Sequence, residues 1–300
     1  MGPRQATLVS LLRRCVPSAA RSQVSPRTKA RIRALLGIEP WPDLAVRHPI
    51  FREAEYRALR EAARGFDVEK PNKPVLERGH QTSYVLARWF TRASMRTAFH
   101  VGYASGRHLF YLSRSGIACG GTDLPEGDTA WVEVPDGALD EATRRRMLRI
   151  DFFHLEPEHL RKVWPDVETH PIDVLFSEAT FETLLPWRAT GVSVPSYHAL
   201  GSEAVHRLMH RSLPEKLEAL QRFASSMAFI EPEPTAGDAG AVFDACARRL
   251  PSMAYSVWRF RPPFDTLFRL SPHHPTRQAI YLFTRDERLA EALQPYAEPR

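Results

Sequence analysis

The feature that most constrains this chain is a short strand that runs directly into a glycine turn and then a helix. Residues 97–101 (TAFHV) are typical of a buried strand, and the helix that follows the turn between Gly102 and Gly106 ends at Gly116. Glycines let the backbone come close to a ligand, and a helix N-terminus presents unpaired N–H groups. The pattern therefore predicts a site for a nucleotide-like ligand.

An acidic residue stands where such a site needs one. The next apolar run, residues 117–122, ends in Asp123, which lies seventeen residues after Gly106. That spacing suits one helix followed by one strand, and an acid at the end of the second strand can accept hydrogen bonds from ribose hydroxyls. A plain strand-end cap is the structural alternative for Asp123, and it stays open here.

The rest of the chain continues the alternation of strands and helices. Further strands are predicted at residues 148–151, 172–177, 227–231, 254–260 and 278–284, with a helix at 241–250 before the last two. Alternating elements of this kind predict an α/β fold with a doubly wound, mostly parallel sheet and helices on both faces.

The N-terminal third has a different texture. From about residue 27 to residue 96 the pattern is helical, interrupted by prolines, and no convincing strand occurs there. We therefore expect a basic N-terminal arm at 1–38, a helical lid or cap at 39–96 and a Rossmann-like domain at 97–290 with a substrate-side insert at 178–225.

The positive charge of the chain is concentrated at its N-terminus. The formal charge is +6, but eight basic residues and no acid precede Glu39, and removing those eight charges leaves −2 for the rest. A nearly neutral body argues against nucleic-acid binding. For the arm itself, a solvated basic tail is favoured over an organelle-targeting segment.

The cysteines and the hydropathy of the chain indicate in which cellular compartment the protein is expected. The three cysteines, Cys15, Cys119 and Cys246, are far apart and lack CxxC spacing, which argues against a disulfide framework and against a zinc site. No apolar run reaches the roughly eighteen residues of a membrane-spanning helix. We expect a cytoplasmic protein without a bound metal.

Four stretches, taken together, resemble the class I S-adenosylmethionine-dependent methyltransferases. VGYASGRHLFYLSRSGIACGGTDLPEG is similar to the first two motifs of that family, IDVLFSEATFETL to its fourth strand, ALQRFASSMAFIEPEP to its fifth and QAIYLFTRD to its last. The match covers roughly residues 80–286. It implies a Rossmann-like methyltransferase fold, S-adenosyl-L-methionine as cofactor and methyl transfer to a small-molecule acceptor at oxygen by in-line displacement.

The resemblance also implies which residues hold the cofactor. These are His100, Gly102, Ala104, Gly106, Asp123, Asp151 and Ser177. Asp151, which would lie near the adenine, could equally be a helix cap.

Several positions depart from the family pattern. His100 stands where the family has an acid, Ala104 replaces the middle glycine, and Thr183 stands where many members have histidine. These departures keep a second reading open, that of a catalytically silent Rossmann-like scaffold or regulatory protein. A third, a nicotinamide-dependent oxidoreductase, is disfavoured because Arg107 occupies the third glycine position of the dinucleotide fingerprint.

Catalysis by such a protein rests mainly on proximity and alignment, with a general base only where the acceptor must lose a proton. The base candidates are His198, His80 and His154, although a single histidine is more often structural. Substrate contacts are expected from Tyr84, Glu182, Trp187 and Tyr197. The expected partner is a small-molecule acceptor, and the sequence leaves a homodimer open.

Overall fold

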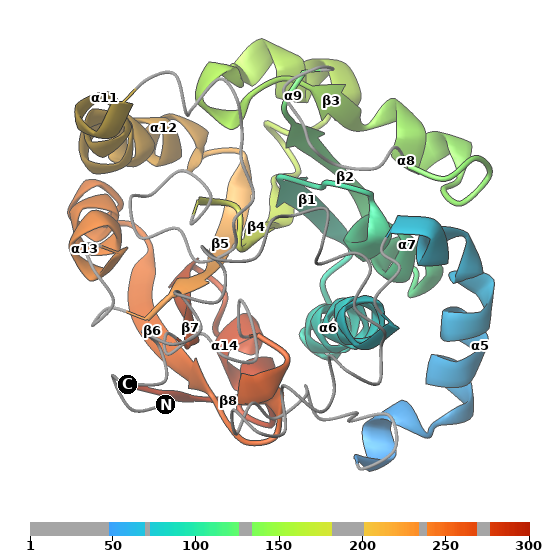
Figure 1. Cartoon of the computed structure of the whole chain (residues 1–300). Coiled ribbons are helices and arrows are strands. Elements are labelled where there is room, and N and C mark those ends of the chain that lie inside the picture. The colour runs from blue at the N-terminus through green and yellow to red at the C-terminus, as the bar shows by residue number, and fades with distance from the viewer. Residues whose placement is uncertain (1–47, 70–72, 126–133, 182–200, 234–238, 269–276) are drawn as a thin grey trace, which may run out of the picture.

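The protein is built around one eight-stranded sheet with the strand order β3-β2-β1-β4-β5-β7-β6-β8 (Figure 1). This computed structural model describes residues 48–69, 73–125, 134–181, 201–233, 239–268 and 277–300. The strands are β1 (Thr97–Val101), β2 (Ala118–Asp123), β3 (Met147–Arg149), β4 (Ile172–Glu178), β5 (Ala224–Pro232), β6 (Ala254–Phe260), β7 (Gln278–Thr284) and β8 (Ala297–Pro299).

Strand directions confirm the predicted doubly wound, mostly parallel sheet. The five strands β3, β2, β1, β4 and β5 are parallel to one another, whereas β7 is antiparallel to both β5 and β6, and β8 is antiparallel to β6. The order reverses between β1 and β4, which is the topological switch point of the sheet. The antiparallel β7 between β5 and β6 departs from the 3-2-1-4-5-6 order of dinucleotide-binding sheets.

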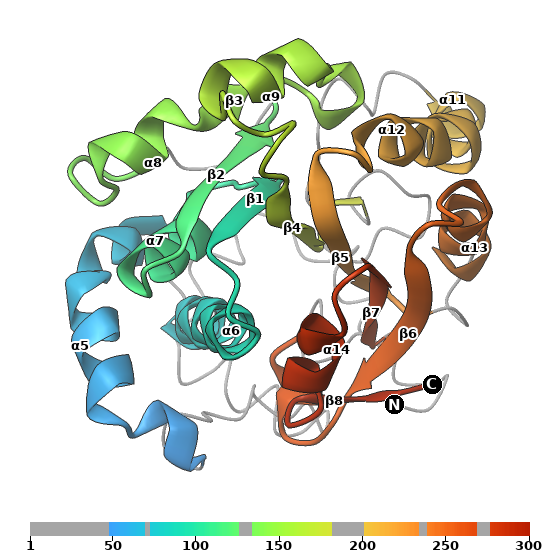
Figure 2. The ribbon, with the colours of Figure 1, turned by 180° about the vertical axis from the view of Figure 1, so that it is seen from behind.

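Helices cover both faces of the sheet (Figures 1 and 2). The α-helices are α5 (Ala54–Ala62), α6 (Lys73–Arg92), α7 (Arg107–Arg114), α8 (Glu141–Arg145), α9 (Pro157–Val163), α11 (Gly201–Arg207), α12 (Leu213–Leu220), α13 (Ala239–Arg249) and α14 (Glu287–Leu293). Shorter turns are the 3-10 helices η1 (Pro49–Phe51), η2 (Arg64–Glu69), η3 (Phe152–His154) and η6 (Phe264–Thr266) and the π-helix η5 (Leu208–Ser212).

The alternation of strand residues divides the interior into two apolar cores. Along β1, Ala98 faces the core shared with α5, α6, α7 and α14, whereas Phe99 and Val101 face the core shared with α9, α11, α12 and α13. Because successive side chains of a strand point to opposite faces, even-numbered residues of β1 face the first core and odd-numbered residues face the second. This matters for the site, because His100 lies on the same face as Ala98.

Helix α6 belongs to the layer that packs on the sheet. Its Trp89 is buried and donates a hydrogen bond from Nε1 to the carbonyl of Leu289 in α14, at 2.8 Å. The helix comes from the segment that the sequence predicts as a lid or cap, and the described part of that segment contains helices and no strand, as expected. The chain reverses direction between α6 and β1, so the two elements run antiparallel. The N-terminal turns of α6 therefore lie at the carboxyl edge of the sheet.

Element limits follow the sequence closely, with one correction. Strands β6 and β7 have the predicted bounds, but β8 carries the sheet beyond residue 290, where the sequence placed the end of the domain. Three residues that include a proline offer no alternation from which a strand could be predicted. None of the helices within the described ranges is long and apolar enough for a membrane crossing.

Candidate functional site

The turn after β1 has the backbone conformation that its glycines suggested. The φ angles are +74° at Gly102, +50° at Ala104 and +79° at Gly106, so left-handed residues alternate through the turn. The N–H of Gly106 donates to the carbonyl of Tyr103 at 2.8 Å, and Gly106 is the N-cap of α7. For Ala104, a positive φ is strained by about 1 kcal/mol or more.

Asp123 lies against this turn, as predicted. Its Oδ2 accepts a hydrogen bond from the N–H of Ala104 at 2.7 Å and its Oδ1 accepts one from the N–H of Leu124 at 2.8 Å. Burial raises the pKa of Asp123, although both backbone donors oppose that shift. Since each carboxylate oxygen has about two acceptor positions, both oxygens can still accept from a hydroxyl-bearing ligand.

Thr180, which follows the end of β4, packs against Gly102, the first glycine of the turn. Its Oγ1 donates to the carbonyl of Val101 at 2.8 Å, and a Cβ added to Gly102 would lie 2.6 Å from that same Oγ1. The turn at Gly102 therefore has no room for a side chain while Thr180 keeps this position.

Glu231 at the end of β5 fixes the segment that carries Thr180. Its Oε1 accepts hydrogen bonds from Ser177 Oγ at 3.1 Å, from the N–H of Thr180 at 3.1 Å and from the N–H of Phe181 at 3.0 Å, and the residue is fully buried. Ser177, predicted as a cofactor contact, is thus engaged with Glu231. Sequence reasoning missed Glu231 and Thr180, because nothing along the chain connects positions about fifty residues apart.

His100 occupies the α6/α7 face of β1 as a buried, neutral ring. It stacks on Phe176 of β4 with centroids 4.4 Å apart and an interplanar angle of 1°. Burial, and then the nearby His108, holds the pKa of His100 well below its usual value. Among the described residues, neither ring nitrogen has a hydrogen-bond partner. A side chain of this kind cannot supply the negative charge that the family places at this position.

A charged cluster lies beside His100 at the end of β4. Glu178 Oε1 is 3.8 Å from Arg78 Nη2 of α6, and Glu178 Oε2 is 3.6 Å from His108 Nε2 of α7. The other ring nitrogen of His108 lies 2.8 Å from Ser83 Oγ. None of these four residues was singled out from the sequence, and only the proximity of Glu178 to the predicted Ser177 could have drawn attention to them.

Asp151 and His154 lie just after β3. Asp151 Oδ1 accepts a hydrogen bond from the N–H of Phe153 at 2.9 Å and so caps η3, which is the structural role the sequence left open for it. The His154 side chain is 82% exposed, with Nδ1 4.0 Å from Asp151 Oδ2. Contact of Asp151 with an adenine stays a prediction, and an exposed His154 is poorly placed to act as a general base.

His80 is a structural residue in this arrangement. It is fully buried, its Nδ1 lies 3.1 Å from the Tyr111 hydroxyl and its Nε2 lies 3.2 Å from Asp67 Oδ1. Burial, and then Arg107 and Arg60, lowers the pKa of His80 to about 2. With both nitrogens engaged and no exposed surface, His80 cannot take a proton from an acceptor here, so the predicted catalytic role is not supported.

Tyr84 likewise belongs to the packing of α5 on α6. It is fully buried against Phe51 and Tyr56, and its hydroxyl donates to Glu53 Oε2 at 3.2 Å. These surroundings account for its burial without a substrate. The other predicted substrate contacts, Glu182, Trp187 and Tyr197, and the base candidate His198 lie outside the described residues.

Within the described segments, histidine, cysteine, aspartate and glutamate side chains form no group of three or more that could hold a metal ion. The candidate site lies at the carboxyl edge of the sheet, where β1, β2 and β4 end. It consists of the positive-φ turn, the Asp123 carboxylate, Thr180 on Gly102 and the charged cluster around Glu178.

Comparison with known proteins finds similarity among solved structures alone, since no family model matches the chain and no curated protein matches it. The bifunctional kinase-methyltransferase WbdD is 14% identical with a TM-score of 0.40, over 68% of this chain and 40% of WbdD. The methyltransferase domain of bacterial CtHen1-CN is 11% identical with a TM-score of 0.39, over 69% of this chain and 98% of that domain.

A third structure is the plantazolicin methyltransferase BpumL in complex with a monoazolic desmethylPZN analog and SAH. It is 12% identical with a TM-score of 0.41, over 81% of this chain and 95% of BpumL. The alignment with WbdD spans about two fifths of that protein's length. At these identities and TM-scores, nothing about ligand or substrate is carried over from the three proteins, and the fold rests on the strand order given above.

Proposed function

We propose that this protein is an S-adenosylmethionine-dependent methyltransferase that acts on a small-molecule acceptor, at oxygen. The observation that carries the proposal is the position of Asp123, whose carboxylate is hydrogen-bonded to the N–H of Ala104 within the positive-φ turn. A carboxylate held at a glycine turn beside the switch point of a parallel sheet suits a ribose. The motif resemblance of the same segment specifies an adenosyl-sulfonium ligand.

The residues present fit such a ligand, and each has a definable task. Asp123 accepts hydrogen bonds from the ribose hydroxyls, the Gly102–Gly106 turn lets the backbone approach, and Asp151 stays the predicted residue near the adenine. The cofactor supplies an activated methyl group with an excellent leaving group. The protein then contributes orientation and exclusion of water, and His198 is the remaining candidate for removing a proton from the acceptor.

Calorimetric titration with S-adenosylhomocysteine tests the proposal. The wild-type protein should bind it, and Asp123→Asn should weaken binding about tenfold or more, because a hydrogen bond to a charged group contributes about 1.5–3 kcal/mol. Asp166→Asn, which alters an exposed carboxylate in the segment before β4, is the matched control and should bind as wild type does. The proposal fails if the folded wild type gives no binding heat, or if the Asp123→Asn variant binds with unchanged affinity.

One observation favours the silent-scaffold alternative. The Thr180 side chain, held by its hydrogen bond to the Val101 carbonyl, fills the space next to Gly102. A ligand cannot approach Gly102 from that side while Thr180 keeps this position. If this closure is permanent, the wild-type protein, which keeps Thr180, should give no binding heat with S-adenosylhomocysteine. If Thr180 is displaced by the ligand, Thr180→Ala should bind S-adenosylhomocysteine at least as tightly as wild type.

A further inference from the structure

The cluster around Glu178 contains opposite charges at the carboxyl edge of the sheet. Glu178 is the last residue of β4, Arg78 lies in the N-terminal turns of α6, and His108 is the second residue of α7. The side chains of Glu178 and Arg78 are each 16% exposed. Charges so nearly removed from water are costly to keep unless something compensates for their desolvation.

The cluster lies where doubly wound sheets generally bind their ligands. Ser177 is the register partner of Val101, so Glu178 lies across from Gly102, between the ends of β1 and β4. The strand order reverses between these two strands, and ligands of doubly wound sheets bind outside the carboxyl ends at that point. The cluster therefore lies beside the glycine turn and not at a remote surface.

The contacts of Glu178 are loose. Its oxygens are 3.8 Å from Arg78 and 3.6 Å from His108, beyond the roughly 3.2 Å of a direct N–H···O bond. Glu231, by contrast, accepts three contacts at 3.0–3.1 Å through one oxygen. Although burial is the largest influence and raises it, the pKa of Glu178 is lowered overall by His108, Arg78 and Arg107. Glu178 is therefore a charged carboxylate with acceptor positions still open.

We infer that Glu178 and Arg78 form a subsite for an amino-acid zwitterion, with the ammonium group on Glu178 and the carboxylate on Arg78. Resting on the proposed function, the occupant is the methionine end of the adenosyl ligand. This explains how the chain functions without an acid at position 100. His100 is neutral there, and the negative charge is supplied from the adjacent strand, by the residue two positions after its stacking partner Phe176.

Two adenosyl compounds separate this inference from the proposed function. S-adenosylhomocysteine carries the amino-acid tail, whereas 5′-methylthioadenosine has the same adenosine and a thioether but no tail. In calorimetric titration of the wild-type protein, the first should bind at least about tenfold more tightly. Glu178→Gln should remove that preference by weakening S-adenosylhomocysteine alone, whereas Glu218→Gln, at an exposed residue on α12, should retain it.

Binding of both compounds with equal affinity, or a preference unchanged in Glu178→Gln, would overturn the subsite and leave the proposed function standing. Absence of binding by both compounds would overturn the two together. Should Glu178→Gln fail to fold, the wild-type protein titrated with the deaminated analogue of S-adenosylhomocysteine gives the same answer. A loss of about tenfold supports the ammonium contact with Glu178, and unchanged affinity refutes it.

Discussion

At the level of single residues, Gly102 meets two separate constraints, and a second glycine allows them to be measured apart. Gly102 has a φ of +74° and no space for a Cβ, whereas Gly116, after α7, has a φ of +80° and no heavy atom within 4 Å of an added Cβ. The two positions share the cost of a left-handed conformation. They differ in the contact with Thr180.

We predict that Gly116→Ala lowers the free energy of unfolding by about 1 kcal/mol, the cost of a positive φ for an L-residue. Gly102→Ala should cost about 1–3 kcal/mol more, because Thr180 must also move. Urea denaturation measures both. In the double variant Gly102→Ala/Thr180→Ala the extra loss should largely disappear, and equal losses in the two single variants would contradict the steric explanation.

The residues whose proximity the sequence could predict are those whose position is set by neighbours in the chain. Gly102, Gly106 and Asp123 belong to one strand–turn–helix–strand unit, so their spacing was sufficient to predict that they meet. The roles of Glu178 and His80 depend on partners in other elements, such as Arg78 for the first and Tyr111 for the second. Without the packing of α6 against α7 and β4, no local pattern distinguishes them from any other charged or histidine residue.

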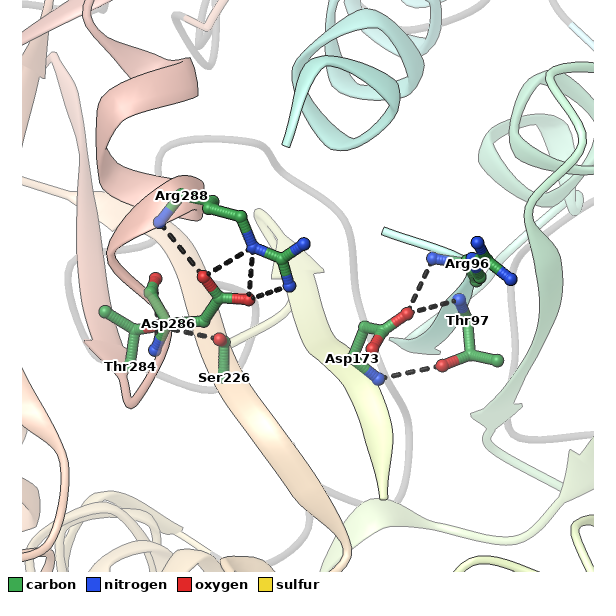
Figure 3. A network of polar contacts seen from close by, with 7 residues as sticks. All are labelled: Arg96, Thr97, Asp173, Ser226, Thr284, Asp286 and Arg288. Carbon is green, nitrogen blue, oxygen red and sulfur yellow. Dashed lines mark hydrogen bonds and ion pairs between the residues drawn. The ribbon is translucent and has the colours of Figure 1, made fainter. Parts of the chain in front are cut away.

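At the level of elements, two groups of polar contacts lie at the amino edge of the sheet (Figure 3), which is the edge opposite the candidate site. Asp173 Oδ2 accepts hydrogen bonds from the N–H groups of Arg96 at 2.6 Å and Thr97 at 2.9 Å, and its own N–H donates to Thr97 Oγ1 at 2.8 Å. These contacts join the starts of β1 and β4. Nearby, Asp286 caps α14 and pairs with Arg288.

For the first of these contacts, we predict that Asp173→Ala lowers the free energy of unfolding by about 1–3 kcal/mol, since two backbone donors lose their acceptor. Asp173→Asn should cost less, because the amide oxygen can still accept. Chemical denaturation of the three proteins gives the order wild type, Asn, Ala. A similar stability of the Ala and Asn variants would show that the side-chain oxygen contributes nothing at this edge.

For the second contact, the prediction concerns pH. Hydrogen bonding to Arg288 is the main influence that lowers the pKa of Asp286. A carboxyl group with a depressed folded-state pKa stabilises the fold fully above the unfolded pKa of about 3.9, and this contribution is lost as the pH falls through the folded-state pKa. Asp286→Asn keeps an N-cap but removes the charge.

Its stability deficit relative to wild type should therefore be largest near neutral pH and shrink below about pH 4. Urea denaturation at pH 7 and pH 3 measures the two deficits. Asp286→Ala should lose about 1 kcal/mol for the cap as well, and that part should persist at both pH values. A deficit of Asp286→Asn that is constant with pH would contradict the ionic contribution.

Elements were predictable to the extent that their own residues define them. The bounds of β6 and β7 could be predicted because each is a seven-residue run of strand-forming residues between breaks. Their opposite directions could not, because the connection between them is long enough for either a hairpin or a crossover. Strand β8 was missed since only pairing with β6 makes these three residues a strand.

At the scale of the whole molecule, the candidate site is assembled from segments that meet only in the folded state. The turn after β1, the end of β2 and the end of β4 contribute Gly102, Asp123 and Glu178, and α6 brings Arg78 from the preceding segment. An unfolded chain cannot present these groups together. A ligand of this site therefore binds the native state alone and stabilises the fold by mass action.

We accordingly predict that S-adenosylhomocysteine at about one hundred times its dissociation constant stabilises the protein by about 2.7 kcal/mol. For a domain of this size, that corresponds to a rise in Tm of about 5 to 10 °C. NAD(H) at the same concentration should leave Tm unchanged, because Arg107 replaces the third glycine of the dinucleotide turn and β7 interrupts the dinucleotide strand order. In Asp123→Asn the same concentration of S-adenosylhomocysteine should produce a smaller rise. A shift with NAD(H) and none with S-adenosylhomocysteine would instead assign the turn to a nicotinamide cofactor, and the methyltransferase proposal would be wrong.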